Sequence, residues 1–152
     1  MVVVRLRMNE VPPLEVLDGD GSSLRFTAIG RTAHELTYCL AVDVGWAKAS
    51  GEVSTYLHGP PTNFFADIAQ SWRGWDGAKT WEDLEHRVGF KATSDKTGHI
   101  TLRVTLRDAN YTGRVELPLS FEAGALDALS RRVASFFEVA QPNTSLERKR
   151  ER

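Results

Sequence analysis

Four histidines and a single cysteine are the residues that could bind a metal ion or move a proton: His34, His58, His86, His99 and Cys39. No two of them have the close helical or hairpin spacing that a zinc site requires. His86 and His99 fall on neighbouring predicted strands, but alternation places His86 with the inward residues and His99 with the outward ones. We therefore expect no metal site and no cofactor, and we interpret His86 as a histidine that hydrogen-bonds within or beside the core.

Nucleophiles and phosphate-binding loops are equally isolated. Ser71, Ser120 and Ser135 do not stand in the G-x-S-x-G turn that exposes a catalytic serine, and Cys39 lies in the middle of a predicted strand. The Gly-Asp-Gly run at residues 19–21 lacks the third glycine and the following helix of a dinucleotide-binding fingerprint, so it is interpreted as a hairpin turn. These patterns favour a protein that is not an enzyme.

Four carboxylates crowd the segment around Trp81: Asp76, Glu82, Asp83 and Glu85. Two of them could act as general acid and general base if they were buried together. Because the segment is polar, a solvated turn or the entry to a strand is the preferred interpretation.

Two surfaces contain residue types that recognise partners. The first is the outward face of a predicted hairpin, which presents the basic residues Arg87, Lys91, Arg103, Arg107 and, from the next strand, Arg114. Only Glu85 and Glu116 oppose them, so this face could attract an acidic ligand. The alternative is a solvated face with cross-strand ion pairs such as Glu85 with Arg107.

The second surface is a loop that contains Arg73, Trp75 and Trp81. Tryptophan and arginine are the residue types that anchor interfaces. The alternative is that both tryptophans close the bottom of the core. Trp72 falls on an apolar helical stripe and is predicted to be buried.

Hydrophobic periods predict the elements that position these residues. Two-residue alternation predicts strands near residues 14–17, 24–28, 36–44, 53–57, 84–92, 100–106 and 115–121. Pro118 donates no ladder hydrogen bond, so the last strand is expected at an edge or at a bulge. Three- and four-residue spacing predicts helices over residues 65–72 and 126–137. Together these elements predict an α+β fold: an antiparallel sheet of six or seven strands with two amphipathic helices packed on one face.

Length and composition indicate a soluble protein with one domain. The chain has 152 residues, of which 41% are hydrophobic and 26% charged, as in ordinary globular domains. Residues 1–141 are predicted to form a single α+β domain, and residues 142–152 a disordered, charged tail. The net charge of −1 argues against a nucleic-acid partner. No apolar run approaches membrane-spanning length, and the lone cysteine suits a reducing compartment, so we expect a cytoplasmic protein.

The order of motifs resembles an actinobacterial family of uncharacterised proteins. The resemblance rests on Trp-Arg-Gly-Trp at residues 72–75, Gly-His-Ile at 98–100 and Leu-Ser-Phe-Glu at 119–122. The general layout is also similar to WapI-type immunity proteins, which are cytoplasmic antidotes to contact-delivered bacterial toxins. This similarity implies a protein toxin domain as the partner, and it implies no catalytic residues.

The leading hypothesis is therefore a non-enzymatic protein-binding domain, in its narrower form an immunity protein that neutralises a bacterial toxin. The alternative is a small ligand-binding or enzymatic domain with a pocket between the helices and the sheet, which would use His86 or the acidic segment around Trp81. The sequence leaves the oligomeric state open.

Overall fold

The computed structural model describes residues 6–142, so most of the predicted tail lies outside the described residues. The elements are β1 (Leu14–Leu17), β2 (Ser23–Arg31), β3 (Leu36–Asp43), β4 (Lys48–Ser54), α1 (Thr62–Gln70), β5 (Ala78–Glu82), β6 (Val88–Ser94), β7 (His99–Arg107), β8 (Arg114–Glu122) and α2 (Leu126–Ala140). Short 3-10 turns occur at Met8–Glu10 and Ala123–Ala125. The chain therefore runs twice through the same order of four strands followed by one helix.

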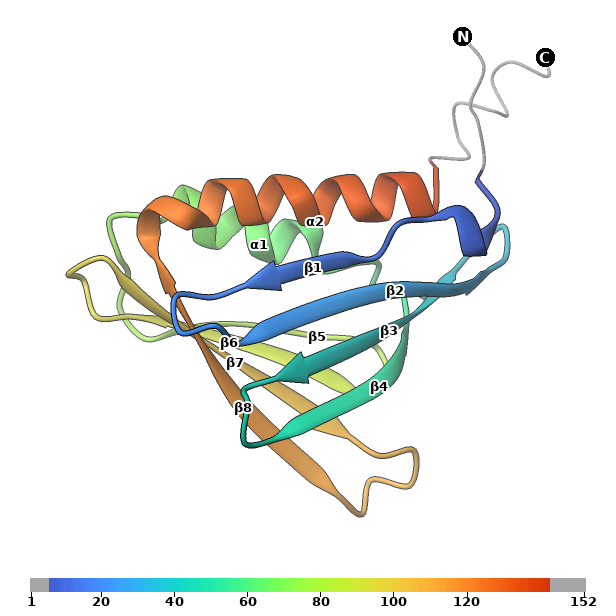
Figure 1. The fold of residues 1–152 in the computed structure, drawn as a ribbon, viewed down its shortest axis with the longest axis horizontal. Helices are drawn as coiled ribbons and strands as arrows, with labels where there is room; N and C mark the ends of the chain where they lie inside the picture. The colour runs from blue at the N-terminus through green and yellow to red at the C-terminus, as the bar shows by residue number, and fades with distance from the viewer. Residues whose placement is uncertain (1–5, 143–152) are drawn as a thin grey trace, which may run out of the picture.

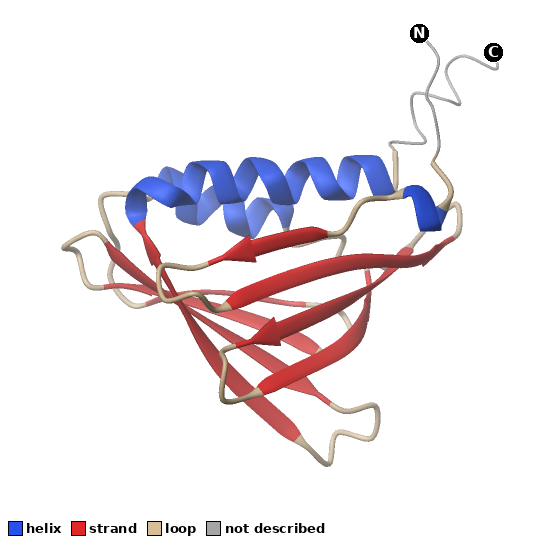
Figure 2. Cartoon of the chain, viewed as in Figure 1, coloured by secondary structure: helices blue, strands red, loops and turns tan. Residues whose placement is uncertain are grey.

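The strands form two four-stranded antiparallel sheets: sheet A has the order β1-β2-β3-β4, and sheet B has the order β5-β6-β7-β8. The sheets approach each other where β4 lies against β7, and the two helices lie side by side across the opposite end (Figures 1 and 2). The α+β class, the antiparallel strands and the two helices are confirmed. The structure differs from the prediction in having eight strands in two sheets instead of six or seven in one. The unpredicted strand is β5, whose only large apolar residue is Trp81, so its sequence lacks the alternation that identifies a strand.

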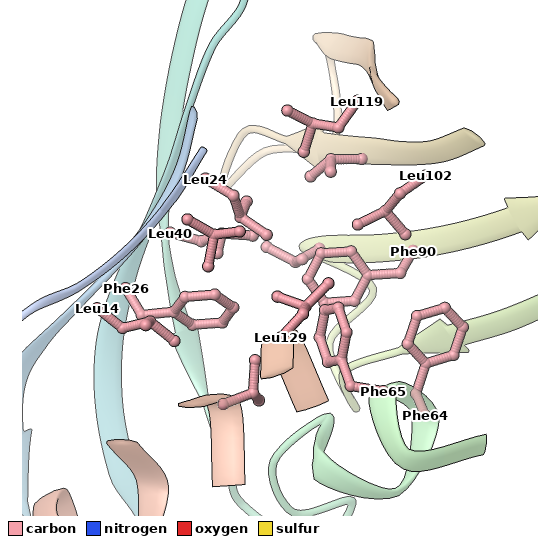
Figure 3. Close-up of a cluster of buried hydrophobic side chains, with 14 of the residues drawn as sticks. Leu14, Leu24, Phe26, Leu40, Phe64, Phe65, Phe90, Leu102, Leu119 and Leu129 are labelled. Carbon is pink, nitrogen blue, oxygen red and sulfur yellow. The ribbon is translucent and has the colours of Figure 1, made fainter. Parts of the chain in front are cut away.

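The core fills the space between the two sheets and the helices. Figure 3 shows Phe26 and Leu40 of sheet A on one side, Phe90 and Leu102 of sheet B on the other, and Leu129 of α2 between them. All five side chains are buried. The four strand residues occupy the inward positions that alternation requires of strands with one solvated face.

Each helix packs its aromatic residues against the sheet of the other half of the chain. Phe65 of α1 lies 5.3 Å from Phe90 of sheet B, measured between ring centroids. Phe137 of α2 lies 5.1 Å from Tyr38 of sheet A. Because α1 follows sheet A and α2 follows sheet B, this exchange joins the two halves into one core. The helices thus cover the inward faces of both sheets, whereas the prediction placed the two helices on one face of a single sheet.

Aspartate side chains hold several hairpin turns in shape. Asp18 Oδ1 accepts the backbone N–H of Ser22 at 2.7 Å in the β1–β2 turn, which confirms the hairpin predicted there. Asp108 Oδ1 accepts the N–H of Thr112 at 2.7 Å between β7 and β8. Asp95 Oδ1 accepts the N–H of Thr97 at 2.8 Å between β6 and β7. Asparagine, aspartate and serine favour turns for this reason.

Two further predictions can be compared with the fold. The strand that contains Pro118 is β8, which lies at an edge of sheet B, as predicted. Within residues 6–142, no helix is both long and apolar enough to cross a bilayer.

Replacing Phe65 of α1 with alanine should lower the free energy of unfolding by about 3–5 kcal/mol, because this side chain is fully buried against Phe90 of sheet B. Urea denaturation measures the change. The matched control is Trp46→Ala, since Trp46 is 84% exposed in the β3–β4 turn and should change stability by less than about 0.5 kcal/mol. Equal losses in the two variants would contradict this description of the core.

The β6–β7 turn should make stability depend on pH in the acid range. Hydrogen bonds from Thr97 lower the pKa of Asp95 to about 2, below the value of about 4 for an unfolded chain. The ionised carboxylate therefore stabilises the fold above about pH 4, and this contribution is lost as the pH falls towards 2. Urea midpoints measured between pH 5 and 2 should fall less steeply for Asp95→Asn than for the unmodified protein. Asp20→Asn is the control, because the Asp20 carboxylate accepts no hydrogen bond within the described residues. If the urea midpoint of Asp95→Asn falls with pH as steeply as that of the unmodified protein, Asp95 does not stabilise the fold in this way.

Candidate partner-binding face of sheet B

Two basic side chains occupy the centre of the outward face of sheet B. Lys91 on β6 and Arg103 on β7 are directly opposite each other in the strand register, and both are exposed. Strand alternation points them outward because the residues on either side of each are buried in the core. Thr80 of β5 and Pro118 of β8 complete this row across the sheet.

No carboxylate compensates this pair: among the described residues, neither Lys91 nor Arg103 takes part in an ion pair. Like charges directly opposite each other on adjacent strands are destabilising. On sheet A, by contrast, opposite charges face each other: Arg25 Nη1 lies 3.2 Å from Oε2 of Glu15, its partner in the register. We therefore expect the Lys91–Arg103 pair to lower the stability of the free protein, and a bound anionic group to relieve the repulsion.

A hollow of about 170 Å³ lies beside the basic pair. Its floor is Gly89 of β6, which stands between Glu82 on β5 and Thr105 on β7 in the register. A Cβ atom at position 89 would lie 3.4 Å from Glu82 Cγ, so a larger residue would occupy this space. Gly89 was not among the predicted site residues, although glycine inside a strand is a signal that another group approaches the backbone closely.

A second pair of like charges lies across the hollow. Arg107 of β7 and Arg114 of β8 are register partners, but each has a nearby carboxylate. Arg107 Nη1 is 4.0 Å from Glu82 Oε1, and Arg114 Nη2 is 3.2 Å from Glu116 Oε2. The predicted pairing of Arg107 with Glu85 is wrong, because Glu85 lies in the β5–β6 turn before β6 begins. We call Lys91, Arg103, Arg107 and Arg114 the basic face.

Arg87 has a different position from the one predicted, since it precedes β6 and is half-buried. Its Nε donates to the backbone oxygen of Arg107 at 3.0 Å, while Arg107 Nη1 donates to the backbone oxygen of His86 at 3.0 Å. Arg87 and Arg107 therefore hold the end of the sheet together. Lys91 and Arg103 have no such structural hydrogen bonds within the described residues.

The structure brings only part of the tryptophan loop to the basic face: Trp81 lines the hollow over Gly89, whereas Arg73 and Trp75 do not. Trp81 stacks on Phe90 with 5.6 Å between ring centroids, and Trp75 Nε1 donates to the backbone oxygen of Ala92 at 3.3 Å. Both tryptophans are half-buried against the core, in agreement with the alternative that they close it. Arg73 is exposed in the turn that follows α1.

The predicted burial of Trp72 is wrong. Helix α1 ends at Gln70, so Trp72 lies in the following turn and is 55% exposed. Arg73 Cζ lies 5.0 Å from the centroid of its ring. The apolar stripe continues in the sequence for two residues after the helix has ended, which explains the error.

The predicted inward position of His86 is also wrong. His86 lies in the β5–β6 turn with φ of 56°, and its Nδ1 contacts the exposed Glu82 carboxylate. Asp83 is buried, and its Oδ1 accepts the backbone N–H groups of Arg87 at 2.8 Å and Val88 at 2.9 Å. The other three carboxylates of this segment are exposed. Asp83 is therefore buried alone and shapes the turn, so the paired burial that acid–base chemistry required does not occur.

The remaining candidate metal ligands lie apart. Residues 6–142 contain no group of three or more histidine, cysteine, aspartate or glutamate side chains that could hold a metal ion. Cys39 is half-buried on the outward side of β3, in register with Thr27 and Glu52.

Arg103→Glu should raise the free energy of unfolding by about 0.2–1 kcal/mol, because it replaces a like-charged partner of Lys91 with an oppositely charged one. Urea denaturation at low salt measures the change. Arg25→Glu is the matched control on sheet A, and it should lower stability by a similar amount because it puts two carboxylates opposite each other. A loss of stability in both variants would show that the Lys91–Arg103 repulsion is negligible.

Comparisons with known proteins give a family and several distant structural likenesses, of which two follow. The structure of the plant transcriptional regulator PBF-2 matches with a TM-score of 0.47 and 6% sequence identity, covering 85% of this chain and 81% of that one. The crystal structures of MRP1/MRP2 from Trypanosoma bruciei match with a TM-score of 0.45 and 13% identity, covering 84% of each chain. No curated protein matches the sequence. A family model covers residues 16–140, so the chain belongs to DUF6228, a family of unknown function.

Proposed function

We propose that this protein is a non-enzymatic domain that binds an acidic partner protein on the basic face. The observation that carries the proposal is the exposed Lys91–Arg103 pair, which has no carboxylate partner within the described residues. Binding of a partner carboxylate between these side chains would replace a repulsion by two favourable contacts. The neighbouring hollow over Gly89 offers space for a partner side chain.

The composition of this face favours a protein over a nucleic acid. Glu82 and Glu116 lie among its arginines. The face is therefore not the continuous cluster of lysine and arginine that marks a surface for a phosphate backbone. Single-stranded nucleic acids are usually held by aromatic side chains on which bases stack. Among the exposed aromatic residues, Trp46, Tyr56 and Trp72 lie outside sheet B. Tyr111 lies in the β7–β8 turn, where its hydroxyl donates to the backbone oxygen of Glu85.

The packing of the core supports a non-enzymatic role. The rival hypothesis requires a pocket between the helices and the sheet. Aromatic side chains fill the centre of that space, and the hollow of about 200 Å³ at its margin, between α2 and Leu14 of β1, contains none of the residues that the rival hypothesis uses. Phe136 and Phe137 pack on Phe26, while Phe64 and Phe65 pack on Phe90. His86, the histidine of that hypothesis, lies outside this space on a turn.

The narrower form of the proposal is immunity to a toxin. It rests on the sequence resemblance to WapI-type antidotes described above. An antidote needs no cofactor, because covering the active site of the toxin is sufficient. The basic face would suit a toxin domain whose active-site surface carries carboxylates.

Site-specific photo-crosslinking in the native cell tests the binding proposal. A benzoylphenylalanine placed at Thr105, in the middle of the basic face, should crosslink one acidic protein. The same group at Thr27, on the outward side of sheet A, is the matched control and should not capture that protein. Capture of nucleic acid at Thr105, or of the same proteins at both positions, would refute the proposal.

The immunity form has its own test, which uses the captured protein. Expression of that protein alone should arrest growth, and co-expression with this chain should restore growth. A captured protein that is harmless when expressed alone would exclude immunity, while the binding proposal would stand.

A further inference from the structure

Three of the four sheet edges are closed by specific contacts. At the edge of sheet A formed by β1, Arg132 Nη2 of α2 donates to the backbone oxygen of Glu15 at 2.7 Å. At the edge of sheet B formed by β5, His58 Nδ1 lies 3.2 Å from the backbone oxygen of Glu82. Both strands are also short, with four and five residues. Short strands and covered backbone groups are the usual protection against unwanted strand pairing.

The edge formed by β8 is closed by the β1–β2 turn and by a proline. Asp18 Oδ2 accepts the backbone N–H of Ser120 at 2.8 Å, and Gly19 N–H donates to the Ser120 oxygen at 3.0 Å. Pro118, two residues earlier, has no N–H to offer. These features block the pairing of a further strand over residues 118–120, in the second half of β8.

The fourth edge, β4, has none of these protections. Its seven residues contain no proline, and its pairing with β3 has no bulge. Val44 N–H donates to Ala47 O at one end of this hairpin, and Thr55 N–H donates to Leu36 O at the other. Antiparallel pairing alternates between bonded and non-bonded residues. This pattern directs the backbone groups of four β4 residues away from β3: Lys48, Ser50, Glu52 and Ser54. Within the described residues, no hydrogen bond reaches these backbone groups.

A groove of about 510 Å³ runs beside this open edge. Ala49 and Ser50 form one wall, and the end of the β7–β8 hairpin forms the other. Leu106 and Val115 supply apolar surface, and Val115 is 41% exposed. Charged side chains also line the groove, three basic and one acidic: Arg87, Arg107, Arg114 and Asp108.

We infer that β4 accepts an extended, acidic segment of the partner protein as a fifth strand of sheet A. Backbone hydrogen bonds to Ser50 and Glu52 would give affinity, and alternate side chains would enter the groove. Apolar residues of the segment suit Leu106 and Val115, and carboxylates suit the three arginines. The inference rests on the proposed function for the partner, and it adds the form in which the partner binds. Arg107 and Arg114 belong to both the groove and the basic face, so one partner can cover both.

A synthetic ten-residue peptide of alternating glutamate and valine tests the inference on the full chain. In NMR titrations the peptide should shift the amide signals of Ser50 and Glu52 and slow their hydrogen exchange. Ser50→Pro should weaken peptide binding by about tenfold or more, because it removes an N–H that faces the open edge. The substitution breaks no hydrogen bond to β3, since this N–H makes none. Ser50→Ala, which keeps the N–H, is the matched control and should bind normally.

A second peptide keeps the test independent of how well Ser50→Pro folds. The same peptide with every backbone nitrogen methylated retains the side chains and charges but loses all N–H donors, and it should not bind the unmodified protein. Equal binding of the two peptides, or of the proline and alanine variants, would overturn the inference. Self-association of the chain that Ser50→Pro abolishes would assign the edge to a second copy, and would also overturn it.

The double variant Lys91→Glu/Arg103→Glu separates this inference from the proposed function. It should lose the partner protein but still bind the peptide at β4, because neither residue lines the groove. If the peptide does not bind β4, while binding of the partner protein still requires Lys91 and Arg103, the inference fails and the proposed function stands. If the double variant retains the partner, the proposed function fails.

Discussion

The fold depends on one constraint: each of its two sheets has a single apolar face, and both faces must be buried in one shared core. Sheet A contacts sheet B where β4 meets β7, and its β1–β2 turn hydrogen-bonds to Ser120 of β8. At the other end the inward faces leave an opening, which the two helices cover (Figure 1). Aromatic residues of α1 and α2 close that opening, each helix packing on the sheet of the other half of the chain. Removing either helix would therefore expose both halves to solvent.

This constraint bears on where a partner could bind. Aromatic side chains fill the centre of the inward space, and the outward faces, the turns and the strand edges are exposed to solvent. The outward face of sheet A balances its charges across strands, as in Arg25 with Glu15. Sheet B places Lys91 against Arg103 instead. The proposed binding of an acidic partner rests on this pair and on the hollow over Gly89 beside it.

Hydrophobic periodicity predicted much of this architecture, because strands with one solvated face alternate clearly and amphipathic helices repeat every three or four residues. It failed where local geometry outweighs pattern. Apolar alternation continued backwards through His86, but the buried Asp83 carboxylate bends the chain there into a turn. Division into two sheets could not be predicted, since alternation does not say which strands pair. The outward direction of Lys91 and Arg103 was predictable; their lack of carboxylate partners and the hollow over Gly89 were not.

The most direct test of the account is the dissociation constant of the crosslinked partner for Arg103→Glu, compared with Arg25→Glu. Both variants make the same charge change on an outward sheet face, one on sheet B and the other on sheet A. If the basic face binds an acidic partner, Arg103→Glu weakens binding by about tenfold or more while Arg25→Glu leaves it unchanged. Equal affinities of the two variants would contradict the account.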